Sequence, residues 1–386
     1  MKWKTARIGD VCQIISGTTP STKIQTYWDG DLNWVTPGEI EENSKYIFST
    51  QKKITEQAVK ETNLRLLPIG TVLLSSRAPI GKVAIAATEM YCNQGFKNLI
   101  CSKEVHNEFL FWFLRGKKDF LNFLGRGATF KEISKDIVAA IELPLPPLAE
   151  QRRIADILDK VDAIRRKRQQ SLKLTDDLVK SQFIEMFGDP GTDPYGWGLT
   201  TLGSCCELNP RRPKNMPSDA EYSFVAMASV SEDGCVDTSI LRPYTEVYKG
   251  FTYFAENDVL FAKITPCMEN GKGGVATKLN NGIGFGSTEF HVLRPIKGIS
   301  NPYWLYFITM FRQFRSDAEK VMTGTGGQRR VPITYLDEYK ITLPPLELQN
   351  QFARFVEQAD KSKFAMQSQL SEIEILSSAL KQKFFA

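Results

Sequence analysis

The sequence predicts an α+β fold in which two globular domains are joined by two long antiparallel helices, which form a coiled coil with pseudo-twofold symmetry. Three observations predict this fold. The chain has 386 residues, more than one hydrophobic core usually supports. The phrase LPPLAEQ at 145–151 returns as LPPLELQ at 343–349, and helical periodicity follows each copy. The segments that precede the two copies are also similar to each other in sequence.

The first long helix is expected over residues 145–188. Apolar side chains recur mostly at steps of three and four residues, among them Ile154, Leu158 and Val161, and no proline or glycine interrupts the run. The double proline of the phrase suits a first helical turn and blocks what precedes it. The sequence GDP at 188–190 is expected to end the helix.

The second long helix is expected over residues 343–386, and it matches the first without a gap at an offset of 198 positions. The match carries Gln151 onto Gln349 and Phe187 onto Phe385. A helix of about forty residues is about 60 Å long, so its apolar stripe needs an equally long partner. The other copy is that partner. Because one compact domain joins the end of the first helix to the start of the second, the pair is expected to be antiparallel.

The two globular domains are expected over residues 1–144 and 189–342. Each contains short β-like runs that Gly, Asn and Pro interrupt, and each ends in an aromatic stretch with helical character. The β-like runs include 71–75, 82–86 and 258–262, and the aromatic stretches are 108–124 and 302–314.

Composition places the chain among folded soluble proteins, with 42% hydrophobic and 24% charged residues. The longest apolar run, 109–114, is too short to span a bilayer, and the N-terminal residues do not resemble a signal peptide. Seven scattered cysteines fit reduced thiols, so a cytoplasmic location without membrane contact is expected. The net charge of +5 is compatible with an anionic partner.

The sequence favours a non-catalytic chain without a metal site. Only two histidines are present, and no CxxC pair exists to hold zinc. The sequence NPRR at 209–212 begins like the NPPY motif of adenine methyltransferases but lacks its second proline and its aromatic residue. The glycine-rich stretches at 271–274 and 324–327 lack the phosphate-binding pattern GxxxxGK[ST].

DNA binding is the chemistry that the side chains favour. Phosphate contacts need Lys, Arg and small hydroxyl side chains on loops, and base edges need Arg, Asn, Gln, Lys or Thr. The cluster GGQRR at 326–330 is the strongest candidate of the second domain, while RRKR at 165–168 fits either a solvated helix face or contacts with DNA or a partner. The candidates are Thr18, Thr19, Ser21, Lys23, Ser76, Arg77, Lys82, Asn93, Gln94, Lys97, Arg126, Thr129 and Lys131 in the first domain, and Arg211, Arg212, Lys214, Lys263, Lys272, Thr288, Gln328, Arg329 and Arg330 in the second.

Several motifs give the chain a family resemblance. These are SGTTPS at 16–21, WVTPGEI at 34–40, SRAPIGK at 76–82, NQGF at 93–96, and the junction LPLPPL at 143–148 with its later copy. With its layout of domain, helix, domain, helix, the chain resembles the specificity (S) subunit of type I restriction-modification systems over essentially its whole length. The second domain departs from the opening motif, since NPRRP at 209–213 stands in place of SGTTP.

The resemblance implies a host-defence role as a DNA-recognition subunit. Each domain would read one half of a bipartite, asymmetric site in double-stranded DNA, and the helix pair would set the spacing between the halves. The exposed helix faces would dock two methyltransferase (M) subunits, and restriction/translocase (R) subunits would complete the complex. S-adenosylmethionine, ATP and Mg²⁺ would then be bound by partner subunits, and no cofactor is expected in this chain.

The sequence leaves two other functional interpretations open. One is a coiled-coil adaptor protein that binds other proteins, and the other is a stand-alone methyltransferase with a degenerate motif. Steep salt dependence of duplex binding distinguishes a DNA-binding protein from an adaptor. Methylation by the purified chain alone would identify the enzyme.

Overall fold

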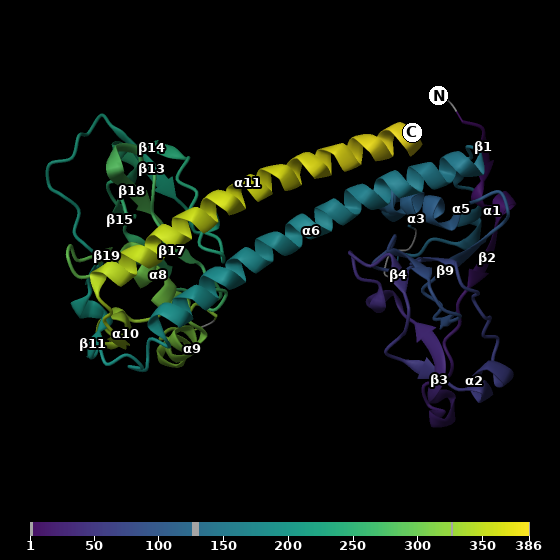
Figure 1. The fold of residues 1–386 in the computed structure, drawn as a ribbon, viewed down its shortest axis with the longest axis horizontal. Coiled ribbons are helices and arrows are strands. Elements are labelled where there is room, and N and C mark those ends of the chain that lie inside the picture. Colours follow the sequence, from purple (N-terminus) through teal and green to yellow (C-terminus); the bar gives the residue numbers. More distant parts are fainter. Residues whose placement is uncertain (1–2, 126–130, 326, 386) are drawn as a thin grey trace. The chain divides into compact units, whose positions relative to one another are not determined.

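The computed structural model describes residues 3–125, 131–325 and 327–385. The chain divides into two compact units, and each is described by itself: unit 1 comprises Met1–Ser171 and Met366–Ala386, and unit 2 comprises Leu172–Ala365. Helices α6 (Leu148–Phe187) and α11 (Leu346–Phe385) contain 40 residues each and contribute to both units (Figure 1). The expected α+β fold of two domains with two long helices is therefore confirmed.

Unit 1 contains a five-stranded sheet in the order β2-β9-β6-β7-β4, a three-stranded sheet β5-β3-β8 and a ribbon of β1 and β10. The short strands follow from the alternation of β-branched residues with turn residues. Its strands are β1 (Thr5–Arg7), β2 (Cys12–Ser16), β3 (Trp28–Val35), β4 (Tyr46–Ile47), β5 (Lys53–Ile54), β6 (Val72–Leu74), β7 (Val83–Ala86), β8 (Tyr91–Cys92), β9 (Lys97–Cys101) and β10 (Glu142–Pro144). Its shorter helices are α1 (Ile8–Val11), η1 (Gln25–Tyr27), η2 (Pro37–Glu39), α2 (Glu56–Glu61), α3 (Asn107–Gly116), α4 (Lys118–Leu124) and α5 (Lys135–Ala139).

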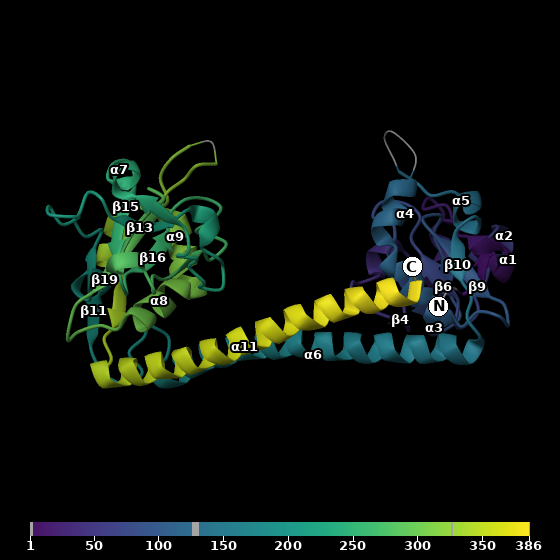
Figure 2. The same ribbon diagram turned by 90° about the horizontal axis from the view of Figure 1, so that it is seen from above.

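Helix α3 forms the centre of the unit 1 core. All six residues from Phe109 to Leu114 are buried, as is typical of a helix that is apolar on every side. The start of α6, through Ile154 and Leu158, and the end of α11, through Phe385, belong to the same core. The Phe385 ring lies 5.4 Å from that of Phe109. The first part of one long helix thus shares a core with the last part of the other (Figure 2).

Unit 2 repeats this plan with two four-stranded sheets, β12-β19-β16-β17 and β14-β13-β18-β15, and a ribbon of β11 and β20. Its strands are β11 (Leu199–Thr201), β12 (Cys206–Leu208), β13 (Glu221–Val225), β14 (Leu241–Pro243), β15 (Thr252–Ala255), β16 (Val259–Ala262), β17 (Gly273–Val275), β18 (Ile283–Gly286), β19 (Phe290–Pro295) and β20 (Lys340–Thr342). Its shorter helices are η3 (Leu202–Ser204), η4 (Met227–Ser229), α7 (Tyr244–Val247), η5 (Asn280–Gly282), α8 (Pro302–Met310), α9 (Arg312–Val321) and α10 (Ile333–Glu338).

An aromatic cluster joins the two long helices in unit 2. Phe183, from the end of α6, lies with its ring centre 5.2 Å from that of Phe352, near the start of α11, and 5.8 Å from that of Phe307 in α8. The end of α6 and the beginning of α11 therefore share the core of unit 2. Together with the opposite pairing in unit 1, these contacts make the helices antiparallel, as predicted.

The repeated phrase places a buried glutamine at the start of each long helix. Gln151 is fully buried, and its amide donates to the carbonyl oxygens of Glu104 (2.8 Å) and Pro146 (2.9 Å) while its Oε1 accepts from the His106 backbone N–H (2.8 Å). The glutamine therefore ties the start of α6 to the turn that leads into α3.

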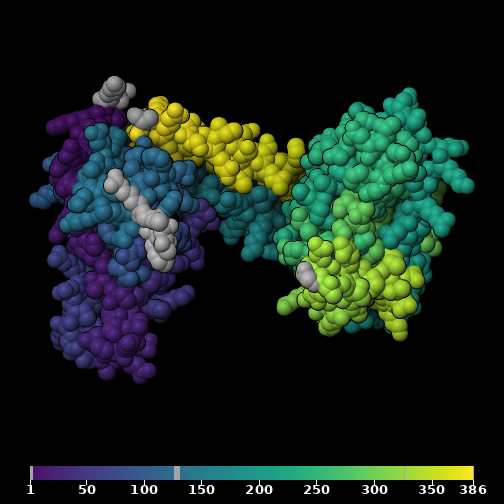
Figure 3. All heavy atoms as spheres, turned by 180° about the vertical axis from the view of Figure 1, so that it is seen from behind, coloured from purple at the N-terminus to yellow at the C-terminus, as the bar shows by residue number. Residues whose placement is uncertain are grey.

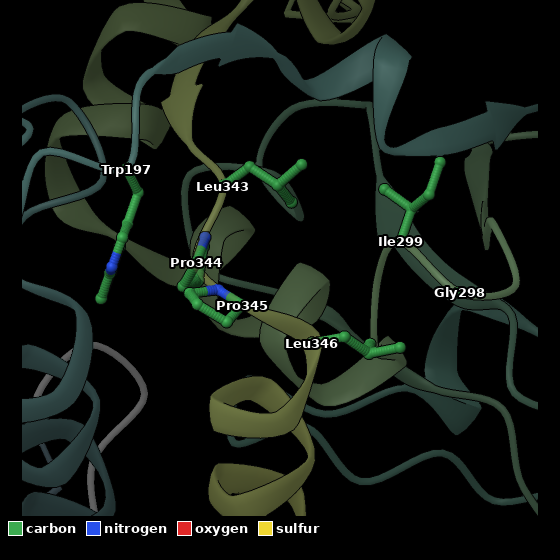
Figure 4. Close-up of a pocket in the computed structure, with 7 residues that line it drawn as sticks. All are labelled: Trp197, Gly298, Ile299, Leu343, Pro344, Pro345 and Leu346. Atoms are coloured by element: carbon green, nitrogen blue, oxygen red, sulfur yellow. The ribbon is translucent and has the colours of Figure 1, made fainter.

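Gln349 is equally buried and makes the equivalent contacts at the start of α11. It donates to Ile299 (3.1 Å) and Pro344 (2.9 Å) and accepts from the Asn301 backbone N–H (2.8 Å). Beside it, Pro344 and Ile299 line an open pocket (Figure 4). The repeated glutamine thus has the same role in both units. Gln151 ties α6 to the turn before α3, and Gln349 ties α11 to the turn before α8.

Within 3–125, 131–325 and 327–385, no helix is both long enough and apolar enough to cross a membrane.

Candidate nucleic-acid interface

Four segments of unit 1 that carry predicted DNA-binding residues converge. The Thr18 N–H donates to the carbonyl of Cys92 (2.9 Å), and the Ser76 N–H donates to that of Gly95 (2.7 Å). The Ile133 N–H donates in turn to the carbonyl of Ser76 (2.9 Å). These bonds bring together the loops that follow β2, β6 and β8 and the segment that precedes α5.

In unit 2, two bonds equivalent to those of Ser76 hold the matching segments together. The Lys263 N–H donates to the carbonyl of Glu289, and the Val331 N–H donates to the carbonyl of Lys263, each at 2.9 Å. The Asn209 N–H donates to the carbonyl of Val292 (2.8 Å), which extends the β12–β19 pairing to the loop after β12. Lys263 therefore occupies the place that Ser76 has in unit 1. The residues after α9, coloured light green, lie on the face of unit 2 that the space-filling view presents (Figure 3).

One predicted lysine in each unit supports these loops from within. Lys82 donates from Nζ to the carbonyl oxygens of Pro37 (3.2 Å) and Ile40 (2.8 Å). Lys272 donates from Nζ to the carbonyl of Met227 (3.3 Å). Both ammonium groups thus hold a 3₁₀ turn, η2 or η4, against a loop. In this structure they position backbone rather than extend into solvent.

A carboxylate organises the cationic side chains of unit 1. Lys97 is buried, and its ammonium lies 3.0 Å from Oε1 of Glu132. Arg77 Nε donates to Oε2 of the same carboxylate at 2.9 Å. Burial alone would raise the pKa of Glu132, but the hydrogen bonds from Lys97 and Arg77 outweigh it and hold that pKa below its usual range. Glu132 is therefore ionised and fixes the orientation of Arg77.

In unit 2 the corresponding carboxylate is Glu289, which pairs with Arg330. Nε and Nη2 of Arg330 donate to its two oxygens at 2.9 and 2.8 Å, and Nη1 donates to the carbonyl of Gln328 at 3.1 Å. The bonds from Arg330 hold the pKa of Glu289 below its ordinary value. Burial lowers the pKa of nearby Lys263. Arg329 lies further from its carboxylates, 3.7 Å from Glu269 and 3.6 Å from Glu319.

His291 occupies the unit 2 position that Lys97 has in unit 1, and it is 5% exposed. One ring nitrogen lies 2.8 Å from the Val331 carbonyl, and the other lies 3.2 Å from the Asn209 amide. Burial lowers the pKa of His291 to about 4 from 6.5. Between about pH 6.5 and pH 4, His291 is therefore protonated in the unfolded chain but neutral in the folded unit.

We expect unit 2 to lose stability as the pH falls through this range. The stabilisation is fully present above about pH 6.5, and its loss is about 3 kcal/mol by about pH 4. Urea denaturation at pH 7 and pH 5 measures this change. His291→Gln should flatten the dependence, because glutamine has no proton to gain. An equal pH dependence in the two proteins would show that another group is responsible.

The other predicted residues lie on or beside the same segments. The hydroxyl of Thr19 contacts the Gln94 amide, and the Asn93 side chain accepts from the Gly95 N–H at 2.9 Å. Arg212 donates to the Tyr248 carbonyl. Arg126 and Thr129 fall outside the described residues. The remaining exposed candidates are Ser21, Lys23, Lys131, Arg211, Lys214, Thr288 and Gln328.

Glu132 and Glu289 did not emerge from the sequence. A search for DNA contacts favours donors, because a carboxylate repels phosphate. Their one sequence signal is adjacency, since Glu132 follows Lys131 and Glu289 follows Thr288. Among the described residues there is no group of three or more His, Cys, Asp and Glu side chains that could hold a metal ion.

Comparison with curated proteins gives a consistent set of relatives. The chain is 34% identical over 262 residues to the specificity subunit of the type I restriction enzyme MjaIX of Methanocaldococcus jannaschii, a match covering 61% of this chain and 60% of that protein. It is 40% identical over 158 residues to the specificity subunit of EcoAI of Escherichia coli, covering 40% of this chain and 26% of that protein. The chain thus spans at most about three fifths of these two relatives.

Solved structures show the same fold. One, described as the structural basis of complex assembly and conformational transition of the type I R-M system, has a TM-score of 0.59 at 20% identity and covers 99% of this chain and 97% of its own. The S subunit of a type I restriction-modification system from M. genitalium has a TM-score of 0.59 at 14% identity, covering 100% of this chain and 96% of its own.

The family model for the type I restriction modification DNA specificity domain matches residues 1–174 and 194–374. Two matches of this length cover most of the chain, and each includes one set of converging loops. The chain therefore belongs to the type I restriction modification DNA specificity family.

Proposed function

We propose that this chain is the DNA-recognition subunit of a type I restriction-modification complex. The observation that carries the proposal is the convergence, in both units, of loops rich in Lys, Arg, Asn, Gln and Thr at equivalent places in the fold. Such side chains supply both the phosphate contacts that position a protein on DNA and the base contacts that specify sequence. The family membership supports the same assignment.

Each unit reads one half of a bipartite, asymmetric site in double-stranded DNA. The two sets of loops differ in side chains, since Lys97 is replaced by His291 and Glu132 by Arg330, so the two half-sites differ in sequence. Helices α6 and α11 set the spacing between the half-sites, as dimer geometry does in other DNA-binding proteins.

The long helices also dock two methyltransferase subunits. Large apolar side chains remain exposed on them in both units: Leu174 is 58% exposed and Phe364 75% exposed in unit 2, and Ile375 is 68% exposed in unit 1. These side chains are available for burial against a partner, where they would add apolar area to the interface. Methyl transfer to adenine from S-adenosylmethionine, and cleavage that depends on ATP and Mg²⁺ in restriction subunits, then belong to the partners, and this chain is non-catalytic.

Co-expression with a cognate methyltransferase subunit tests the proposal. Mapping of methylated adenines across the host genome should give one gapped motif with two specified halves. A stable complex that leaves methylation at background would contradict the proposal. Methylation by the chain alone would instead identify an enzyme, and duplex binding that does not weaken with salt would favour an adaptor protein.

A further inference from the structure

We propose that Arg330, oriented by Glu289, reads a guanine in the half-site of unit 2, and that Arg77, oriented by Glu132, reads a guanine in the half-site of unit 1. This inference rests on the proposed function and adds to it one base in each half-site. Glu132 and Glu289 lie among cationic loops, although a carboxylate repels the phosphates that such loops would bind.

The contacts of Arg330 leave two N–H donors for a ligand. A guanidinium has five N–H donors in a fixed planar fork. Glu289 engages Nε and Nη2, and the Gln328 carbonyl engages Nη1. The contacts among the described residues thus account for three donors, and one N–H remains on each of Nη1 and Nη2. Two parallel donors are the pattern that guanine O6 and N7 accept in the major groove.

The side chain is accessible but held in place. The Arg330 side chain is 41% exposed, while the Glu289 side chain is 23% exposed. An ion pair at this exposure contributes little to folding stability. Its main physical effect is to fix the plane of the guanidinium, which reduces the conformational entropy lost when the arginine meets a base.

Unit 1 builds the same pair from different positions. Arg77 Nε lies 2.9 Å from Glu132, and the Arg77 side chain is 46% exposed. Arg77 pairs in a β-bridge with Glu132, and the bridge at the same place in unit 2 joins Ile264 to Arg330. The arginine is therefore contributed by opposite sides of equivalent bridges. The pair is present in both units although Glu289 comes from a third segment and not from the bridge, where Ile264 faces Arg330, and this recurrence points to a use for the pair itself.

Mutation in the complex tests the inference. Arg330→Met keeps a long side chain but removes every guanidinium donor, so one guanine position in one half of the methylated motif should become degenerate while the other half stays unchanged. Arg77→Met should relax a guanine in the opposite half. Glu289→Gln should relax the same position as Arg330→Met. Arg312→Met, at an exposed site on α9 of unit 2, is the matched control and should leave the motif as it is.

Modified DNA tests the same contact without altering the protein. A duplex with 7-deazaguanine at the assigned position lacks the N7 acceptor, and it should bind the wild-type complex about tenfold more weakly than the unmodified duplex. The Arg330→Met complex, which has no donor at this position, should bind both duplexes alike.

Several results would overturn the inference while leaving the proposed function intact. These are a half-site without guanine, an unchanged motif in Arg330→Met, or equal wild-type affinity for both duplexes. Absence of any gapped methylation motif with the wild-type complex would instead remove the proposed function itself.

Discussion

Replacing Phe183 with alanine is expected to lower the free energy of unfolding of unit 2 by about 3–5 kcal/mol. The Phe183 side chain is 1% exposed and lies within 5.2 Å, between ring centres, of both Phe311 and Phe352. Its removal leaves a cavity where α6, α8 and α11 meet, and the flanking helices cannot all close upon it. Thermal and urea denaturation of the full chain measure the loss.

Ile184→Ala is the matched control for this prediction. Ile184 is the next residue of α6 and is 54% exposed, so its truncation should change the stability of the isolated chain by at most about 0.5 kcal/mol. Equal effects of the two substitutions would show that the aromatic cluster does not hold the helices together in unit 2.

Replacing Gln151 with leucine is expected to destabilise unit 1 by about 3 kcal/mol. Leucine fills the space but leaves the carbonyls of Glu104 and Pro146 and the N–H of His106 without the partners they have in the native chain. Gln349→Leu should have a similar effect on unit 2, because its contacts are equivalent.

The matched control for Gln151→Leu is Gln170→Leu. Gln170 lies on the same helix, is exposed, and should tolerate leucine with a change of at most about 0.5 kcal/mol. A Gln151→Leu protein as stable as the control would mean that the repeated motif only starts the helix and that the Gln151 amide does not stabilise unit 1.

The long helices were predictable because their signal is local and repeated. Helices α6 and α11 begin at Leu148 and Leu346, directly after each double proline, and both contain 40 residues. The expected strand at 71–75 is found as β6 (Val72–Leu74). The aromatic stretch 108–124 is helical, as expected, and it forms the two helices α3 and α4, because the backbone of Lys117 leaves the helical region at φ −107° and ψ 16°.

The candidate site was predictable only as a set of segments. Residue type identified the loops, but the roles of individual side chains depend on contacts between segments far apart in the chain. Lys82 reaches Ile40, and Lys97 reaches Glu132 across a separation of 35 residues. No local sequence pattern distinguishes a lysine that is bonded within the protein from one that is available to contact DNA.

The same limit applies to differences between the two helix ends. The position that matches Phe183 in the second helix is Lys381, whose ammonium lies 5.7 Å from the centre of the Trp112 ring in unit 1. Burial lowers the pKa of this lysine. The two long helices therefore share the buried glutamine near the start, while the residues that pack near their ends differ.

Each unit is expected to read its own half of the DNA site independently of the other unit. Exchange of residues 1–140 for the equivalent segment of another family member, followed by methylation mapping of the complex, tests it most directly. A new sequence is expected in one half of the motif and an unchanged sequence in the other. A change in both halves would contradict independent recognition.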